Sequence, residues 1–233
     1  MAAVLELQRE ALDDGCAVSA LLRKALVVAR KLHLPEFEQW VNTELRGYDP
    51  EKDEVPSYRE VSGQVKAWNP FHGWVTVMFG SDEHANFLSH RKCSQSVAEL
   101  EALLDGKTAA SELYMPFQPE LQRMMRKATG ERTDFALFTS HTEPVKILNA
   151  VRTIILNWAL KLEEDGILGE GLLFSKEEKE RAQRAPQNIA NFFGPVHHPT
   201  LQQGGGNLAS VSVDMGSCVR PSLLWRLRSM PWN

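Results

Sequence analysis

The stretch covering residues 142–166 constrains the fold more than any other part of the sequence. Its large apolar residues recur at spacings of three or four, which places them on one side of a helix. They are Leu148, Val151, Ile155, Trp158 and Leu162, and Ile147, Ile154 and Ala159 broaden the same side. Thr142 and Pro144 suit a first helical turn, and Gly166 suits the left-handed residue that ends a helix. We therefore predict a long helix with a buried face, around which a core assembles.

Shorter helices are predicted in the first fifty residues. Residues 4–12 and 18–32 form two of them, and a third begins at Pro35 and ends at Gly47. Proline is tolerated in a first helical turn, and glycine readily ends a helix. Because a very short turn separates the second helix from the third, we expect the two to pack as an antiparallel hairpin.

Beyond residue 57 the apolar period changes from helical to two, which is typical of strands. We predict a hairpin of residues 58–68 and 74–79, and another strand at residues 135–139. Between them we predict a helix over residues 94–104, with Ser96 and Glu99 as a capping box, and a short helix beginning near Pro119. The segments around residues 81–93 and 105–118 are expected to be loops.

The order of these elements favours an α+β fold, in which the helical hairpin and the long C-terminal helix pack with a small antiparallel sheet. We assign residues 1–171 to this domain. Residues 172–187 are predicted to be a polar helical linker, because Ser175 and Glu178 make a capping box and almost no side chain there is apolar. Residues 188–233 are predicted to be a tail with a short apolar strand, followed by Gly-rich and basic sequence without fixed structure.

Composition limits the class of protein. Hydrophobic residues make up 43% of the chain and charged residues 24%, with a net charge of −4, as in ordinary globular proteins. No apolar run approaches the roughly 18 residues that span a bilayer, and the N-terminus lacks a secretory signal pattern. Cys16, Cys93 and Cys218 are odd in number and far apart, so no disulfide framework is expected. These features indicate a cytoplasmic protein.

Common catalytic motifs are absent from the sequence. There is no G-x-S-x-G elbow and no cysteine motif pairing a thiol with a histidine, and the glycines at 204–206 lack the context of a phosphate-binding loop. We predict no catalytic residue and no cofactor. Glu83, His84 and His90 are weak candidates for metal ligands, because they lack the spacing of known zinc sites. A polar loop is the favoured interpretation of that segment.

The charge pattern gives little support for nucleic-acid binding. Four cations lie within the predicted helix of residues 18–32, but the acidic balance of the chain favours a solvated helix face; they are Arg23, Lys24, Arg30 and Lys31. The end of the chain carries three arginines and two tryptophans, at Arg220, Arg226, Arg228, Trp225 and Trp232. It is a candidate for contact with a polyanion or a membrane surface, although such termini are commonly disordered.

An apolar group follows the polar linker and is a candidate for self-association; it consists of Ile189, Phe192, Phe193 and Val196. A short apolar strand can add to an exposed sheet edge of a partner or of a second copy. It can equally pack back on its own domain, and the two interpretations stay open.

Two stretches carry a family resemblance. The first, over residues 21–59, contains Lys24, Arg30, Trp40, Glu44, Leu45, Gly47, Tyr48, Pro56, Tyr58 and Arg59, and the second, over residues 147–164, contains Arg152. On these residues the chain resembles the bacterial abortive-infection AbiTii family from about Leu7 to Glu164. The NIANFFGPVHHPTLQQG stretch also looks like tails that follow this domain in relatives.

The resemblance implies a cytoplasmic role in phage defence, within systems of two components, and it brings no established chemistry. The pattern residues are interpreted as structural, with Arg152 paired to Glu44 or to Asp134. The favoured hypothesis is a non-enzymatic sensor, adaptor or assembly module that binds a protein partner or associates through its tail. The alternative is a toxin enzyme, a metal-dependent nuclease that uses Glu83, His84 and His90.

Overall fold

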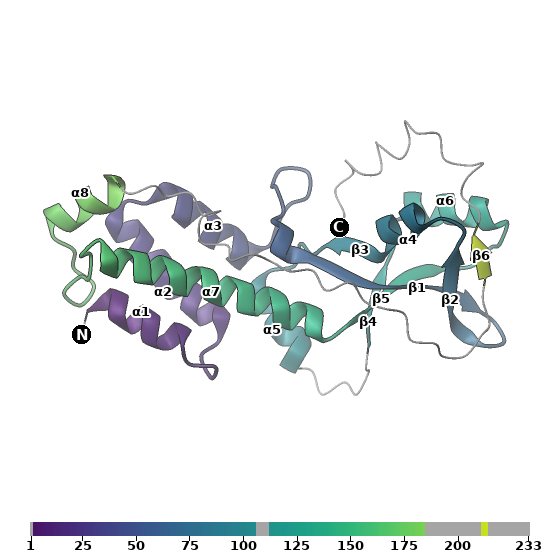
Figure 1. Ribbon diagram of the computed structural model, residues 1–233, viewed down its shortest axis with the longest axis horizontal. Coiled ribbons are helices and arrows are strands. Elements are labelled where there is room, and N and C mark those ends of the chain that lie inside the picture. The colour runs from purple at the N-terminus through teal and green to yellow at the C-terminus, as the bar shows by residue number, and fades with distance from the viewer. Residues whose placement is uncertain (1, 106–111, 185–210, 214–233) are drawn as a thin grey trace. The chain divides into compact units, whose positions relative to one another are not determined.

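The computed structural model describes residues 2–105, 112–184 and 211–213, and it confirms the α+β fold (Figure 1). In chain order the elements are α1 (Ala3–Ala11), α2 (Val18–Leu32), α3 (Pro35–Arg46), a 3₁₀ turn (Ser57–Arg59), β1 (Glu60–Asn69), β2 (Gly73–Phe79), α4 (Asp82–Ser89), β3 (His90–Lys92), α5 (Val97–Asp105), β4 (Glu112–Pro116), α6 (Pro119–Thr129), β5 (Phe135–Ser140), α7 (Thr142–Glu164), α8 (Lys176–Arg184) and β6 (Val211–Val213). No helix among the described residues is long and apolar enough to cross a membrane.

The chain folds into two compact units. The helical unit holds α1, α2, α3, α5, α8 and α7 from Pro144 onward. The sheet unit holds residues 49–94 and 112–143, together with β6. The predicted boundaries at residues 171 and 187 stay predictions. The predicted tail lies outside the described residues, apart from β6.

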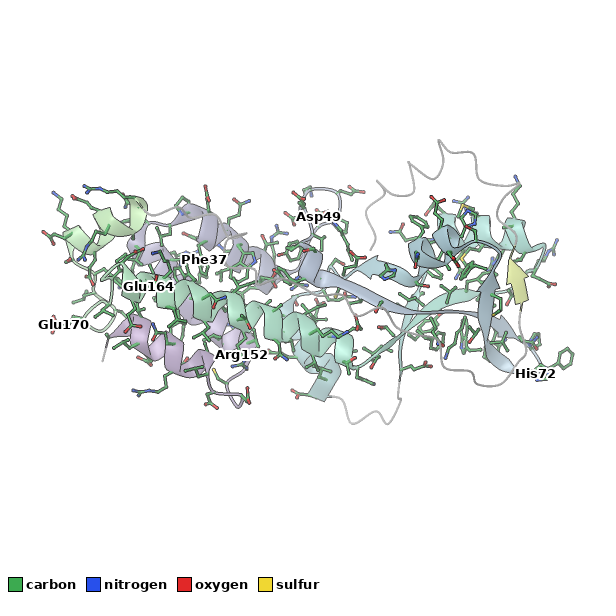
Figure 2. All side chains as sticks on the ribbon, in the orientation of Figure 1. Phe37, Asp49, His72, Arg152, Glu164 and Glu170 are labelled. Atoms are coloured by element: carbon green, nitrogen blue, oxygen red, sulfur yellow. The ribbon has the colours of Figure 1, made fainter. Side chains whose placement is uncertain are left out.

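Helix α7 has the buried face that the sequence predicts. All eight residues of its apolar side are buried, and the Trp158 ring stacks on Phe37 of α3 with centroids 3.7 Å apart (Figure 2 labels Phe37). The helix ends as predicted at Gly166, where φ is 68°. The amides of Gly166 and Ile167 donate to the carbonyls of Glu163 and Leu162, which satisfies two groups at the helix end.

The predicted hairpin of α2 and α3 is present. Pro35 is in the first turn of α3, and Gly47, with φ of 89°, ends it. The turn between the helices depends on His33, the one non-glycine residue with positive φ in the described part of the chain. Its φ of 58° lets the amides of His33 and Leu34 donate to Arg30 and Ala29. A Cβ-bearing residue there carries strain that glycine would avoid.

Helix α8 begins with the predicted capping box. The amide of Glu178 donates to the Ser175 hydroxyl oxygen, and the Ser175 amide donates to the Glu178 carboxylate. The sequence did not predict the contact that follows, because α8 packs against α2 and buries Ala182 completely. Polar contacts add to this packing, because the amides of Leu168 and Gly169 donate to the Glu178 carboxylate and Arg181 donates to the Asp165 carbonyl.

The sheet is mixed, with strand order β4–β5–β1–β2–β6, and β3 pairs with β1 off this path. The predicted β1–β2 hairpin forms, and Asn69 accepts hydrogen bonds from the amides of Phe71 and His72 at its turn (Figure 2 labels His72). β1 and β5 are antiparallel, with Gln64 opposite Phe138. β6 pairs with β2 in parallel.

One face of the sheet is covered by α4 and α6, which lie on the same side of the strands (Figure 1). Its core comprises Val65, Ala67, Val77, Leu88, Phe117, Leu121, Met125, Phe135 and Leu137. Because side chains alternate along a strand, the intervening residues lie on the opposite face. The two faces therefore have different environments.

Two loop predictions were wrong. Residues 82–89 form α4 and residues 90–92 form β3, and residues 112–116 form the edge strand β4. α4 is only eight residues long and fully buries only Leu88, which is too little for a helical period to show. β4 is short and ends in proline, which weakens a strand pattern.

Gly63 tests the pairing of β1 with β5. A Cβ at this position would overlap the backbone carbonyl of Phe138, which a strand cannot move cheaply. We expect Gly63→Ala to lower the free energy of unfolding by roughly 1–3 kcal/mol, measured by urea denaturation. Gln64→Ala, at the exposed neighbouring position, is the control and should change it little. Equal stability of the two variants would contradict this close approach.

His33 gives a prediction of opposite sign. His33→Gly should raise the free energy of unfolding by about 0.5–1 kcal/mol, because relief of left-handed strain exceeds the extra freedom of glycine in the unfolded chain. His33→Ala keeps the Cβ and should bring no such gain. Thermal melts of the two variants compare them directly, and a less stable glycine variant would show that His33 is not strained.

Candidate functional site

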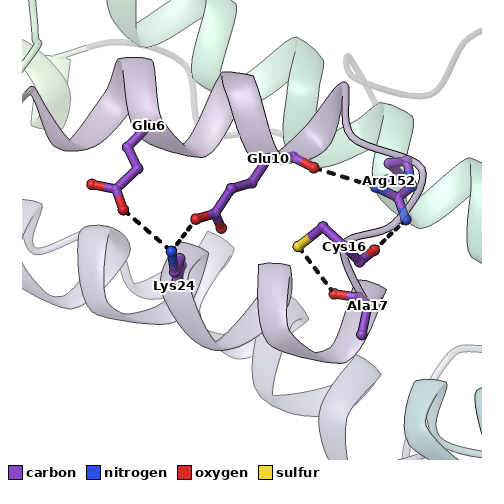
Figure 3. Close-up of polar contacts among 6 residues, drawn as sticks. All are labelled: Glu6, Glu10, Cys16, Ala17, Lys24 and Arg152. Atoms are coloured by element: carbon purple, nitrogen blue, oxygen red, sulfur yellow. Dashed lines mark hydrogen bonds and ion pairs between the residues drawn. The ribbon is translucent and has the colours of Figure 1, made fainter.

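Two cations of the family pattern tie helices together on the surface. Lys24 of α2 donates to Glu6 and Glu10 of α1, and the hydrogen bond to Glu10 raises the pKa of Lys24 (Figure 3). Arg30 Nε donates to Glu38 Oε1 at 2.6 Å, joining α2 to α3. These charges are matched by carboxylates within the helical unit, so they leave little basic surface for a polyanion.

A buried polar pair closes the end of α3. Glu44 is fully buried, and the Tyr48 hydroxyl donates to its Oε1 at 2.6 Å. Trp40, one turn before Glu44, is buried with its ring centroid 5.1 Å from that of Phe37. Gly47, which lies between Glu44 and Tyr48 in the chain, ends the helix.

The sheet unit buries two arginines. Arg59 is fully buried, donates through Nη1 to the Cys93 carbonyl at 3.2 Å, and accepts the Cys93 amide on its own carbonyl. Tyr58 beside it is also buried. Arg91 donates to the Pro116 carbonyl at 2.7 Å, and burial lowers its pKa. Each of these guanidinium groups donates to a backbone carbonyl of another segment of the sheet unit.

The predicted pairing of Arg152 with Glu44 or Asp134 was wrong. Its guanidinium reaches the end of α1 and donates to the carbonyls of Glu10 (3.4 Å), Asp13 (2.8 Å) and Cys16 (2.5 Å). Figure 3 shows the contacts with Glu10 and Cys16. The last carbonyls of a helix lack partners within the helix, so a cation there is favourable. The Cys16 side chain is partly buried, and this burial raises the pKa of its thiol.

The structure does not bring the candidate metal ligands together as a set. Glu83 and His84 are in the first turn of α4, and His90 follows its last residue. Nδ1 of His90 lies 2.7 Å from the backbone oxygen of Asn86. Within residues 2–105, 112–184 and 211–213, no group of three or more His, Cys, Asp and Glu is arranged to hold a metal ion.

The self-association candidates of the tail, Ile189, Phe192, Phe193 and Val196, lie outside the described residues. Their predicted role stays a prediction.

A group of aromatic side chains occupies the sheet face opposite α4 and α6. β1, β2, β4 and β5 each supply one ring, and we call these rings with their neighbours the aromatic face: Lys66, Trp68, Trp74, Met78, Tyr114 and Phe138. Trp74 is central, with centroids 5.6 Å from Trp68, 5.5 Å from Tyr114 and 5.1 Å from Phe138. Tyr114 and Phe138 also contact each other, edge to face.

The rings of Trp74 and Tyr114 lean toward each other across the sheet. Their strands, β2 and β4, are separated by β1 and β5, a backbone distance of about 14 Å. Ring centroids 5.5 Å apart therefore require both side chains to reach over the middle strands. Ala136, on the same face in the middle, is fully buried, and its small size leaves room for them. The rings of this face therefore pack against one another as a cluster.

Lys66 is held within this cluster. Its Nζ lies 4.6 Å from the Phe138 ring centroid and 2.5 Å from Glu112 Oε2. The negative face of the aromatic ring and the carboxylate both attract the ammonium group. Three members of the aromatic face remain about half exposed: Trp68 at 46%, Met78 at 51% and Tyr114 at 52%.

The sequence does not predict this face, because residues 112–116 are expected to be part of a loop. The sequence ELYMP does alternate, with Leu113 and Met115 on the covered face and Tyr114 on the open one. That alternation spans only five residues, and it became informative once its pairing with β5 was known.

A family comparison covers most of the chain. The family model for AbiTii matches residues 3–187, from the start of α1 to just beyond α8. No curated protein matches, and no solved structure matches.

Arg152 provides a test of the helical unit. We expect Arg152→Ala to lower the free energy of unfolding by about 1.5–3 kcal/mol, because carbonyls at the end of α1 lose a charged donor. Arg152→Lys should be intermediate, since a single ammonium cannot reach all three carbonyls. Lys161→Ala, which removes only exposed ion pairs, is the control and should change stability by less than about 1 kcal/mol. A loss for Arg152→Ala no larger than the control's would contradict the assignment.

Proposed function

Because the chain belongs to the AbiTii family, whose role is abortive-infection phage defence, we propose that it acts in the cytoplasm as a non-enzymatic sensor or adaptor that binds a protein partner through its aromatic face. The defence role follows from the family. The mode of action rests on the aromatic face.

The open aromatic face is the observation that carries this proposal. Single exposed apolar residues are ordinary on a protein surface, whereas contiguous patches mark binding sites. Trp68, Tyr114 and Met78 are exposed on one sheet face, and the Trp74 ring contacts the rings of Trp68 and Tyr114. Aromatic residues and methionine are enriched where proteins bind each other, and tryptophan and tyrosine commonly contribute much of the binding energy.

Charge favours a protein over a nucleic acid as the partner. Residues 49–94 and 112–143 carry nine Lys and Arg and twelve Asp and Glu, a net charge of −3. On the aromatic face, the charge of Lys66 is balanced by adjacent Glu112. Nucleic-acid binding draws most of its affinity from basic side chains that contact phosphates, and this unit lacks an excess of them.

Phage protection in cells that carry the complete system tests the proposal. We expect Trp68→Ser and Tyr114→Ser to abolish protection while the far-UV circular dichroism stays that of the parent chain, because exposed rings contribute to binding more than to folding. Leu173→Ser is the matched control, since Leu173 is 73% exposed in the helical unit. Protection measured as the efficiency of plating should survive that change.

The enzymatic alternative predicts a different pattern. His84→Ala should leave protection intact if the chain acts by binding. Loss of protection in His84→Ala, with full protection in Trp68→Ser and Tyr114→Ser, would contradict the proposal.

A further inference from the structure

We propose that the aromatic face binds a second copy of this chain, so that two copies associate sheet against sheet. This inference rests on the proposed function, because it assigns an occupant to the same surface. Three properties of the face support it: its balanced charge, its size and the shape of its side chains.

The charges of the aromatic face are self-complementary. Lys66 and Glu112 are adjacent, with Nζ and Oε2 2.5 Å apart. In a two-fold interface, a residue that meets another on the second copy is met by it in return. Two such faces can therefore form two equivalent ion pairs, each between Lys66 of one copy and Glu112 of the other. A surface selected for a polyanion or a strongly basic partner would show an excess of one sign.

The size of the face suits a dimer. A fully buried aromatic side chain covers roughly 150–250 Å², so the exposed parts of the rings, Met78 and nearby Phe71 amount to several hundred Å². Phe71, at the tip of the β1–β2 turn, is 90% exposed. Gln64, Thr76 and Ser140 are in register with members of the aromatic face or with Glu112, so they add polar area on the same side of the sheet. The total approaches the roughly 800 Å² per partner of stable interfaces.

The side chains of the face fit sheet-on-sheet packing. Two sheets that stack face to face lie about 10 Å apart, a gap filled by long side chains from both. Trp68, Met78 and Tyr114 project from three different strands and remain half exposed, whereas Ala136 between them is short and buried. Two copies bury these projecting side chains against each other in a two-fold arrangement.

Light scattering after size exclusion, on the full chain across a wide dilution series, gives the first test. The mass should approach twice the 26.2 kDa of one chain at high concentration and fall toward one chain on dilution. Trp68→Ser should stay at the mass of one chain throughout. Leu173→Ser, exposed in the other unit, should behave as the parent chain does.

A charge exchange identifies the contact. Lys66→Glu gives a face with two acids, and Glu112→Lys gives a face with two bases, so each variant alone repels its own copy and should remain monomeric. An equimolar mixture should recover the double mass, because each acidic face meets a basic one. Both variants lose the ion pair within one chain, so recovery can come only from contact between chains.

Met78→Glu covers the case in which a substitution at Lys66 prevents folding. Met78 is exposed, and its replacement leaves the ion pair of Lys66 and Glu112 in place. The Met78→Glu variant should fold and stay monomeric. A parent chain that is monomeric at every concentration, or a dimer that survives Met78→Glu and the unmixed charge variants, overturns the inference. If such a chain still loses phage protection in Trp68→Ser, the proposed function stands with a different protein as partner.

Discussion

An apolar surface must be covered, and the two units of this chain meet that constraint in different ways. In the helical unit, the apolar side of α7 is buried against neighbouring helices. The stacked rings of Phe37 on α3 and Trp158 on α7 show how closely these two helices pack. In the sheet unit, one face is covered by α4 and α6. The other face is covered partly by its own side chains, because Trp74 and Tyr114 lean over Ala136.

The aromatic side chains cover only part of the sheet face opposite α4 and α6. Rings in edge and tilted contact stabilise one another, and they shield the centre of the face without closing it. The outer rings stay exposed. A monomer tolerates this exposure, and a partner can cover the rings. The residues of the family pattern have a different role: Glu44 accepts from Tyr48, and the guanidinium groups of Arg59 and Arg152 donate to backbone carbonyls. These polar contacts position the backbone, whereas the exposed rings supply the surface on which the proposed binding role rests.

Local signals in the sequence were enough for most elements. The period of α7, the glycine stops at Gly47 and Gly166, and the capping box of α8 each depend on residues within a few positions, and each is confirmed. The partner of Arg152 was wrong because it depends on how α1 meets α7, 136 or more residues apart. The aromatic face was missed for the same reason, since its rings come from four strands that only the fold brings together.

The central claim, that the aromatic face is buried by a partner, is tested most directly by fluorine NMR of the full chain with its six tryptophans replaced by 5-fluorotryptophan. Trp68→Phe identifies the Trp68 signal by its loss. The account predicts that this signal shifts as the protein is concentrated, while the signal of Trp158, buried on α7, does not. A Trp68 signal that keeps the same shift at every concentration and with the complete defence system present would contradict it.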